Sequence, residues 1–188
     1  MRVEYRSFEE NSGRLNEHFL LGEIKKPPEY FDALKKLQKN NGYVPYEDSL
    51  KLARKFSPYD PTNPEKPFLN DLRIEFIDVA GMTEEDDMNR VKIFTAVGSP
   101  LDQWHGVDTF IEVENKNHIG SKIVKFDTKT DAKVESEIKR HNLHDLKADV
   151  LIYNIPDRET HAKKYYARLK EMAEEGLAAL NAQEQKAA

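Results

Sequence analysis

The sequence predicts an α/β fold, closer to the α+β type, in which helices flank a mixed β-sheet, with a small helical portion in front of this core. Two observations carry this prediction. Three alternating segments that read as strands follow one another between residues 90 and 129. A helical segment, an apolar strand and an amphipathic helix come next, so the fourth strand joins the sheet through a helical crossover. The expected order of the core is αβββαβ.

The composition is typical of a globular protein with one hydrophobic core. The chain has 188 residues, of which 38% are hydrophobic and 34% charged. No run approaches the ~20 apolar residues of a membrane span, and the first residues lack a signal-peptide core, so we expect a cytoplasmic protein without membrane contact. The chain has no cysteine, so any metal must be held by oxygen or imidazole.

Residues 1–67 are expected to form a helical extension. One helix opens at Pro28 and closes at Asn41 and Gly42, and a second runs over 46–56. The segment 57–67 holds four prolines and reads as a non-helical linker. The sequence leaves open whether these helices clamp nucleic acid, form a homodimer or dock on a larger protein complex.

The core is expected to cover residues 68–188. Its first element reads as a helix over 68–82, although a strand over 74–79 competes because that segment also alternates. After an acidic turn at 83–87, alternation predicts strands over 90–97, 107–114 and 122–129.

The remaining elements have capping and apolar signals. Thr130 and Asp131 cap a helix over 132–141. Residues 148–155 form the most apolar segment, which we expect to be a central strand. Pro156 and Asp157 are expected to start the last amphipathic helix.

The second and third predicted strands place chemically useful side chains on one face. A hairpin with its loop over 115–120 sets Asp108 directly across from Asp127, with Cβ atoms roughly 5 Å apart. Lys129 lies two residues beyond Asp127, about 7 Å further along the same face. Two opposed carboxylates are hard oxygen ligands suited to one divalent cation.

The residues Gly106-Val107-Asp108 and Asp127-Thr128-Lys129, with the helix and strand that follow, resemble the PD-(D/E)XK nuclease superfamily. The resemblance covers roughly residues 68–155 and implies a restriction-endonuclease-like fold. A polar, His-containing loop before Asp108 adds to the likeness. The third-strand acid departs from the pattern, because it is Asp where Glu is commoner.

The resemblance implies a metal-dependent nuclease that hydrolyses phosphodiester bonds of nucleic acid, with DNA as the expected substrate. Asp108, Asp127 and the backbone carbonyl of Thr128 would hold Mg²⁺ (or Mn²⁺), and Lys129 would assist the attacking water. Glu75 is the closest match to an additional acid from the first core helix. If 74–79 were a strand, Glu84 or Glu85 would take that place.

Several side chains near the site are candidates for binding nucleic acid. Lys116 to Arg140 contains seven basic residues and four acidic ones, although the whole chain carries a net charge of −5. Lys125 and Lys133 are the expected phosphate contacts. Trp104 either stacks on a base or is buried, and His105 either assists as a second base or is a structural loop residue.

A second interpretation stays open. Asp108 and Asp127 can be solvated strand residues, with Lys125 and Lys129 paired to Glu112 and Glu114, since cross-strand ion pairs are common. The protein would then be a catalytically inactive nuclease-fold binding or assembly module. The form of the substrate and the choice between endo- and exonucleolytic cutting also stay open.

Overall fold

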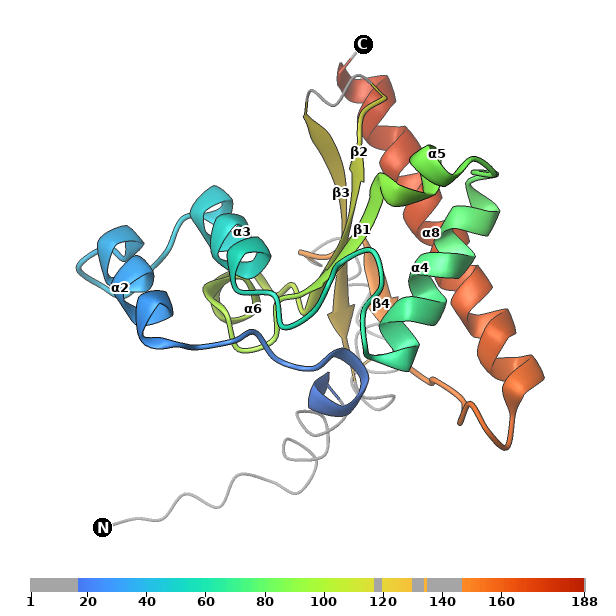
Figure 1. Cartoon of the computed structure of the whole chain (residues 1–188), viewed down its shortest axis with the longest axis horizontal. Helices are drawn as coiled ribbons and strands as arrows, with labels where there is room; N and C mark the ends of the chain where they lie inside the picture. The colour runs from blue at the N-terminus through green and yellow to red at the C-terminus, as the bar shows by residue number, and fades with distance from the viewer. Residues whose placement is uncertain (1–16, 117–119, 130–133, 135–146, 188) are drawn as a thin grey trace.

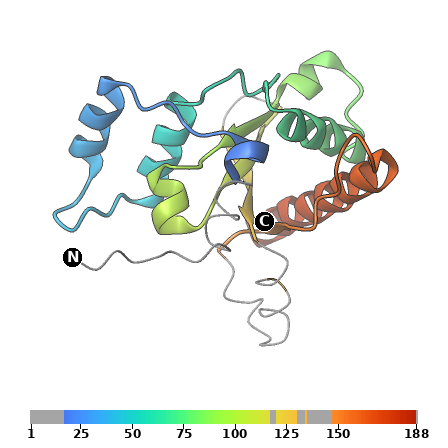
Figure 2. The ribbon, with the colours of Figure 1, turned by 90° about the horizontal axis from the view of Figure 1, so that it is seen from below.

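The protein is described here by a computed structural model that covers residues 17–116, 120–129, 134 and 147–187. A four-stranded mixed sheet lies between two layers of helices (Figures 1 and 2). The strands β1 (Val91–Thr95), β2 (Thr109–Glu114), β3 (Ser121–Thr128) and β4 (Val150–Ile152) follow the spatial order β1-β2-β3-β4. The first three are antiparallel and β4 runs parallel to β3, so the predicted mixed α/β sheet is confirmed.

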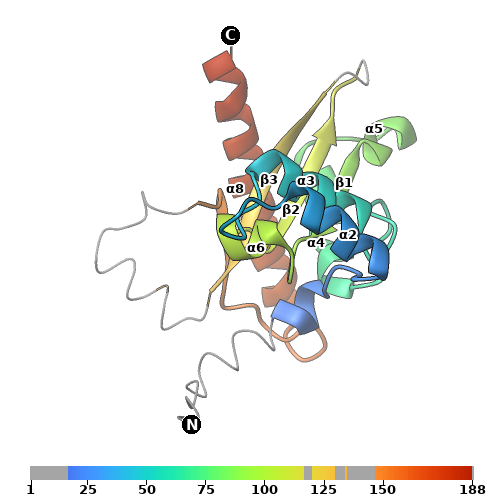
Figure 3. The same ribbon diagram turned by 90° about the vertical axis from the view of Figure 1, so that its left-hand side faces the viewer.

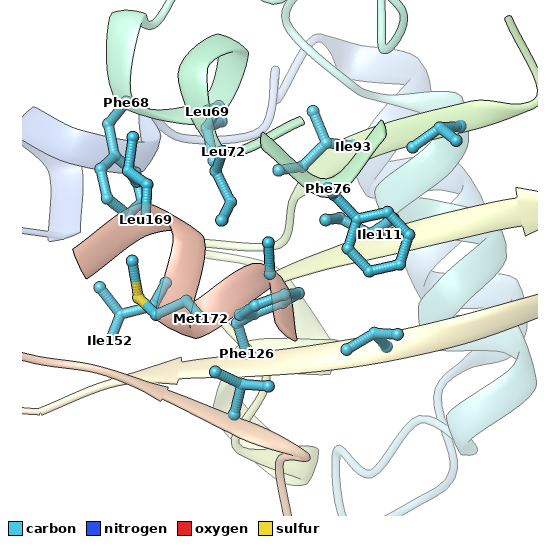
Figure 4. Close-up of a cluster of buried hydrophobic side chains, with 14 of the residues drawn as sticks. Phe68, Leu69, Leu72, Phe76, Ile93, Ile111, Phe126, Ile152, Leu169 and Met172 are labelled. Atoms are coloured by element: carbon cyan, nitrogen blue, oxygen red, sulfur yellow. The ribbon is translucent and has the colours of Figure 1, made fainter. Parts of the chain in front are cut away.

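Helices α4 (Pro67–Val79) and α8 (Ala162–Ala187) cover one face of the sheet. Helix α4 begins with Pro67, whose missing N–H is no loss in the first turn. The helix continues through residues 74–79, so the helix prediction for this segment is confirmed and the competing strand is wrong. Apolar residues of both helices meet those of the sheet in one buried cluster (Figure 4). Its labelled members are Phe68, Leu69, Leu72, Phe76, Ile93, Ile111, Phe126, Ile152, Leu169 and Met172.

The other face is covered by α3 (Tyr46–Lys55) and α6 (Pro100–His105), with α2 (Pro28–Leu37) outside α3 (Figure 3). Leu50 and Ala53 of α3 pack against Phe94 and Phe110, whose rings stack at 5.0 Å. Helix α3 thus packs directly on the sheet, although it belongs to the portion expected before the core. The domain boundary drawn at residue 67 stays a prediction.

Strand β4 is an edge strand, so the prediction of a central strand is wrong. All three residues of β4 (Val150, Leu151 and Ile152) are buried, which explains their apolar character. A strand that is buried on both faces can still lie at the edge of the sheet. Beside β4, the guanidinium of Arg168 from α8 donates to the Leu151 carbonyl at 3.2 Å, which satisfies one backbone acceptor of this edge strand.

The last helix starts at Ala162, later than predicted. Asp157 closes a turn before the helix, because its carboxylate accepts from the backbone N–H and the hydroxyl of Thr160 at 2.8 and 2.7 Å. Strand β2 begins at Thr109, also later than predicted. The predicted helix 132–141 lies outside the described residues, apart from Val134, which is helical and buried.

Two short helices replace segments predicted as turn or loop. Helix α5 (Glu85–Asn89) contains most of the acidic segment before β1. Helix α6 replaces the polar loop before Asp108, because Ser99 accepts from the Leu101 N–H at 3.1 Å and Pro100 stands in the first turn. In the ranges that the structure describes, no helix combines the length and the apolar character needed to cross a membrane.

The contact between α8 and the sheet depends on Gly176. A Cβ at this position would lie 3.2 Å from Val124 Cγ1 and 3.3 Å from Phe76 Cε2. We expect Gly176→Leu to lower the free energy of unfolding by about 1–3 kcal/mol, because overpacking outweighs the gain in helix propensity. Urea unfolding measures this effect. The exposed Ala178→Leu on the same helix is the control, and equal stability of both variants would contradict the close packing.

Candidate functional site

Asp108 and Asp127 lie close together at one end of the β2–β3 hairpin. The regular pairing of the two strands ends at Thr109 and Phe126, and beyond it the Asp108 N–H donates to the Phe126 carbonyl at 2.9 Å, so Asp108 and Asp127 lie next to this last pair, at neighbouring ends of β2 and β3. The N–H of Thr128 donates to Asp108 Oδ2 at 2.7 Å. The predicted hairpin register is confirmed for Thr109 to Glu114, and the charge of Asp127 acts on Asp108, whereas the direct opposition of the two aspartates stays a prediction.

Lys129 lies beside this pair. Its Nζ is 2.5 Å from Asp127 Oδ2, while its own N–H donates to the Ile152 carbonyl of β4 at 2.9 Å. The parallel pairing of β3 with β4 thus fixes the backbone from which the ammonium group reaches Asp127. The three groups that the sequence placed on one face lie together.

The pair is buried. The exposed fraction is 4% for Asp108 and 9% for Asp127. Burial raises the pKa of Asp108 to about 8, and the charge of Asp127 adds to this, against the opposing hydrogen bond from the Thr128 N–H. Without a cation, Asp108 therefore holds a proton at neutral pH.

Two further acids act on Asp108 that the sequence did not single out. The charges of Glu17 and Asp102 both raise its pKa by smaller amounts. Asp102 lies in α6 and accepts from the Gly98 N–H at 2.8 Å. Glu17 is brought in by the N-terminal segment, where the Ile24 N–H donates to the Val97 carbonyl at 3.2 Å just past β1. No local sequence pattern indicates that Glu17 lies near Asp108, because the two residues are far apart in the chain.

Glu75 lies in α4 among other charged groups. Its pKa is raised by partial burial and by the charges of Asp78 and Asp71, with Lys170 of α8 acting against them. Within the described parts of the chain, no three Asp, Glu or His side chains gather into a group able to hold a metal. The assignment of Glu75 as a ligand stays a prediction without geometric support.

The alternative acids Glu84 and Glu85 lie at the opposite end of the sheet. They start α5, which leads into Val91, whereas Asp108 lies beyond the other end of β1, next to Thr95. Their exposed positions place them away from the buried pair.

The expected nucleic-acid contacts lie at different places. Lys125 Nζ donates to the Lys147 carbonyl at 3.0 Å and lies 3.7 Å from Asp149. Trp104 is 41% exposed, which excludes the buried alternative. Lys133 lies outside the described residues.

His105 has a structural environment. Its Nε2 is 3.0 Å from the Val44 carbonyl, and its ring lies between those of Tyr43 and Tyr46. These contacts join α6 to the segment before α3. They agree with a structural role of His105, which was the alternative to a role as a second base.

The cross-strand ion pairs of the second interpretation are not those observed. Glu112 pairs with Arg54 of α3 at 2.8 Å, and Glu114 pairs with Lys92. Lys129 pairs instead with Asp127. The carboxylates of the candidate site thus have the lysine that the nuclease interpretation expected beside them.

Comparisons of the chain with models of protein families, with curated proteins and with solved structures found no significant match. The functional assignment therefore rests on the geometry of the site.

The raised pKa of Asp108 predicts a pH-dependent stability. The folded protein keeps a proton on Asp108 between about pH 4 and pH 8 that the unfolded chain has released, so its stability falls as the pH rises through this interval. The variant Asp108→Asn has no carboxyl group to titrate at this position, and its amide oxygen can still accept a hydrogen bond from the Thr128 N–H. We expect this variant to be more stable than the parent, by a margin that is larger at pH 8 than at pH 5.

Urea unfolding at both pH values without divalent cations measures this margin. Asp86→Asn, which removes an exposed carboxylate of α5, is the control. A margin that does not change with pH would show that the carboxyl of Asp108 is not held in its neutral form.

Proposed function

We propose that this protein is a metal-dependent nuclease that hydrolyses phosphodiester bonds of nucleic acid, with DNA as the expected substrate. The observation that carries the proposal is the nearness of Asp108 and Asp127 at neighbouring ends of β2 and β3, with the ammonium group of Lys129 on Asp127. Buried acids with strongly perturbed pKa values next to a specific charged partner are typical of functional sites.

The fold supports the same proposal. The order α4, β1, β2, β3, β4, with the short helices α5 and α6 before β1 and β2, and the pairing of the strands are those expected of a restriction-endonuclease-like αβββαβ core of the PD-(D/E)XK type, whose second helix would fall outside the described residues. In such a core the first acid stands at the start of the second strand and the acid–x–lysine triplet at the end of the third. Asp108 and Asp127-Thr128-Lys129 occupy these positions.

The donor set suits Mg²⁺ or Mn²⁺. Mg²⁺ is usually bound through one or two carboxylates and keeps several waters, so Asp108, Asp127 and the Thr128 carbonyl supply the ligands that such an ion uses. The chemistry that the ion supplies when bound is polarisation of the phosphate and a lower pKa of a water molecule.

The chain's own residues have separate roles. Asp108 must release its proton before it binds a cation, so metal binding is coupled to proton loss. Lys129 is held by Asp127 and can orient the attacking water or stabilise negative charge that develops on the phosphate. The burial of both aspartates keeps bulk water out and strengthens these electrostatic interactions.

The metal site is tested without catalysis. We expect Mn²⁺ to stabilise the parent protein by about 2.7 kcal/mol at a concentration 100 times its Kd. Asp108→Asn and Asp127→Asn should remove this effect, whereas Glu114→Gln, at the far end of the same sheet, should keep it. Thermal unfolding with and without Mn²⁺ measures this stabilisation. If Mn²⁺ stabilised Asp127→Asn as much as the parent protein, this site would be ruled out.

Nicking of supercoiled plasmid in Mg²⁺ or Mn²⁺ tests the activity. We expect Asp127→Ala and Lys129→Ala to slow nicking by at least about 100-fold, because they remove a metal ligand and the group that stabilises charge. Lys92→Ala is the matched control, since it breaks another lysine–carboxylate pair of the sheet, away from Asp108.

Unchanged nicking in both variants would disprove the proposed site. A pure parent protein that binds nucleic acid but does not nick it in either metal would support the inactive binding module.

A further inference from the structure

Trp104 is an exposed indole at the end of α6, on the side of the sheet opposite to α4 and α8 (Figure 3). Its exposed fraction is 41%, and it is the only tryptophan of the chain. Singly exposed aromatic side chains are ordinary on protein surfaces. Trp104 differs because it belongs to a group of aromatic and cationic side chains.

The indole is held by the segment between α2 and α3. Tyr43 meets it edge-on, with ring centroids 5.8 Å apart. The next residue of α6, His105, contacts Tyr43 and Tyr46 and lies 3.0 Å from the Val44 carbonyl. The aromatic surface is thus preorganised, and a ligand that stacks on it does not have to order it first.

Lys147 and Lys39 contact residues of this surface, and Lys125 contacts Lys147. Lys147 Nζ donates to the Trp104 carbonyl at 3.1 Å, and Lys125 Nζ donates to the Lys147 carbonyl at 3.0 Å. Lys39 Nζ lies 5.5 Å from the centroid of the Tyr43 ring. Asp149, at 3.7 Å from Lys125, offsets one of these charges. Two further acids are near, because burial and, after it, the charge of Glu47 raise the pKa of Tyr46, and Asp102 lies two residues before Trp104 in α6. The feature that suits single-stranded nucleic acid is therefore the exposed aromatic face, on which bases can stack, with lysines beside it for phosphate contacts.

The surface lies close to the candidate catalytic pair. Trp104 precedes Asp108 by four residues, and the chain between them turns at Gly106, whose φ is 61°. The two Cα atoms are therefore at most about 14 Å apart. A strand whose phosphate lies at Asp108 and Asp127 can place a nearby base at Trp104.

We infer that Trp104 stacks on an unpaired base of the bound strand, so that the substrate is nucleic acid with a single-stranded segment. The inference rests on the proposed nuclease function for the position of the strand. A base inside a duplex is already stacked on both faces and must be extruded before it can meet the indole.

Fluorescence of the single tryptophan tests this inference directly. The protein is titrated with oligothymidylate in EDTA, where no cleavage interferes, and the affinity is measured in parallel by anisotropy of a labelled strand. We expect quenching of the Trp104 emission and a loss of affinity of about 5- to 100-fold in Trp104→Ala. Trp104→Phe should keep most of the affinity.

Tyr166→Ala is the matched control, because Tyr166 is 40% exposed and lies on α8, on the opposite face of the sheet. We expect it to bind as the parent does. Equal binding by the parent and Trp104→Ala without quenching would overturn the inference, as would tighter binding of blunt duplex than of single strand. Because the titration contains no metal, a failure of stacking is separate from a failure of nicking or of Mn²⁺ binding.

Discussion

The antiparallel register of β2 with β3 is the constraint on which the candidate site depends. A shift by one residue would turn the side chain of Asp127 away from Asp108, because successive side chains alternate between faces. The register is held by the core, where Ile111 and Val124 pair inside the apolar cluster. The same packing that stabilises the fold therefore sets the distance between the two carboxylates.

Placing two carboxylates in a buried position has an electrostatic cost, and the structure meets it differently for each. Asp127 has the ammonium group of Lys129 beside it, whereas Asp108 keeps a proton because its pKa is raised. A divalent cation bound to both carboxylates would balance their charges, so neither the ammonium group nor the proton would be needed for that purpose. A structural ion pair would need only one acid and one base, so the second buried acid is the feature that supports the proposed metal site.

The two helical layers have different relations to the site. Helices α4 and α8 supply the apolar cluster behind the sheet, and α3 and α6 cover the face that carries the Trp104 surface. The N-terminal segment also takes part, since hydrogen bonds near Val97 bring Glu17 within electrostatic reach of Asp108. The extension is thus connected with the site rather than being a mere appendage.

The sequence alone determined the local features of this protein. Alternation placed β1, β2 and β3, and the short hairpin loop predicted the register that brings Asp108 and Asp127 to neighbouring strand ends, because such a loop joins segments that are close in the sequence. Only the tertiary structure decided the edge position of β4, the exposure of Trp104 and the approach of Glu17 to Asp108. A hydrophobic pattern tells which face of an element is buried, but not which distant element covers it.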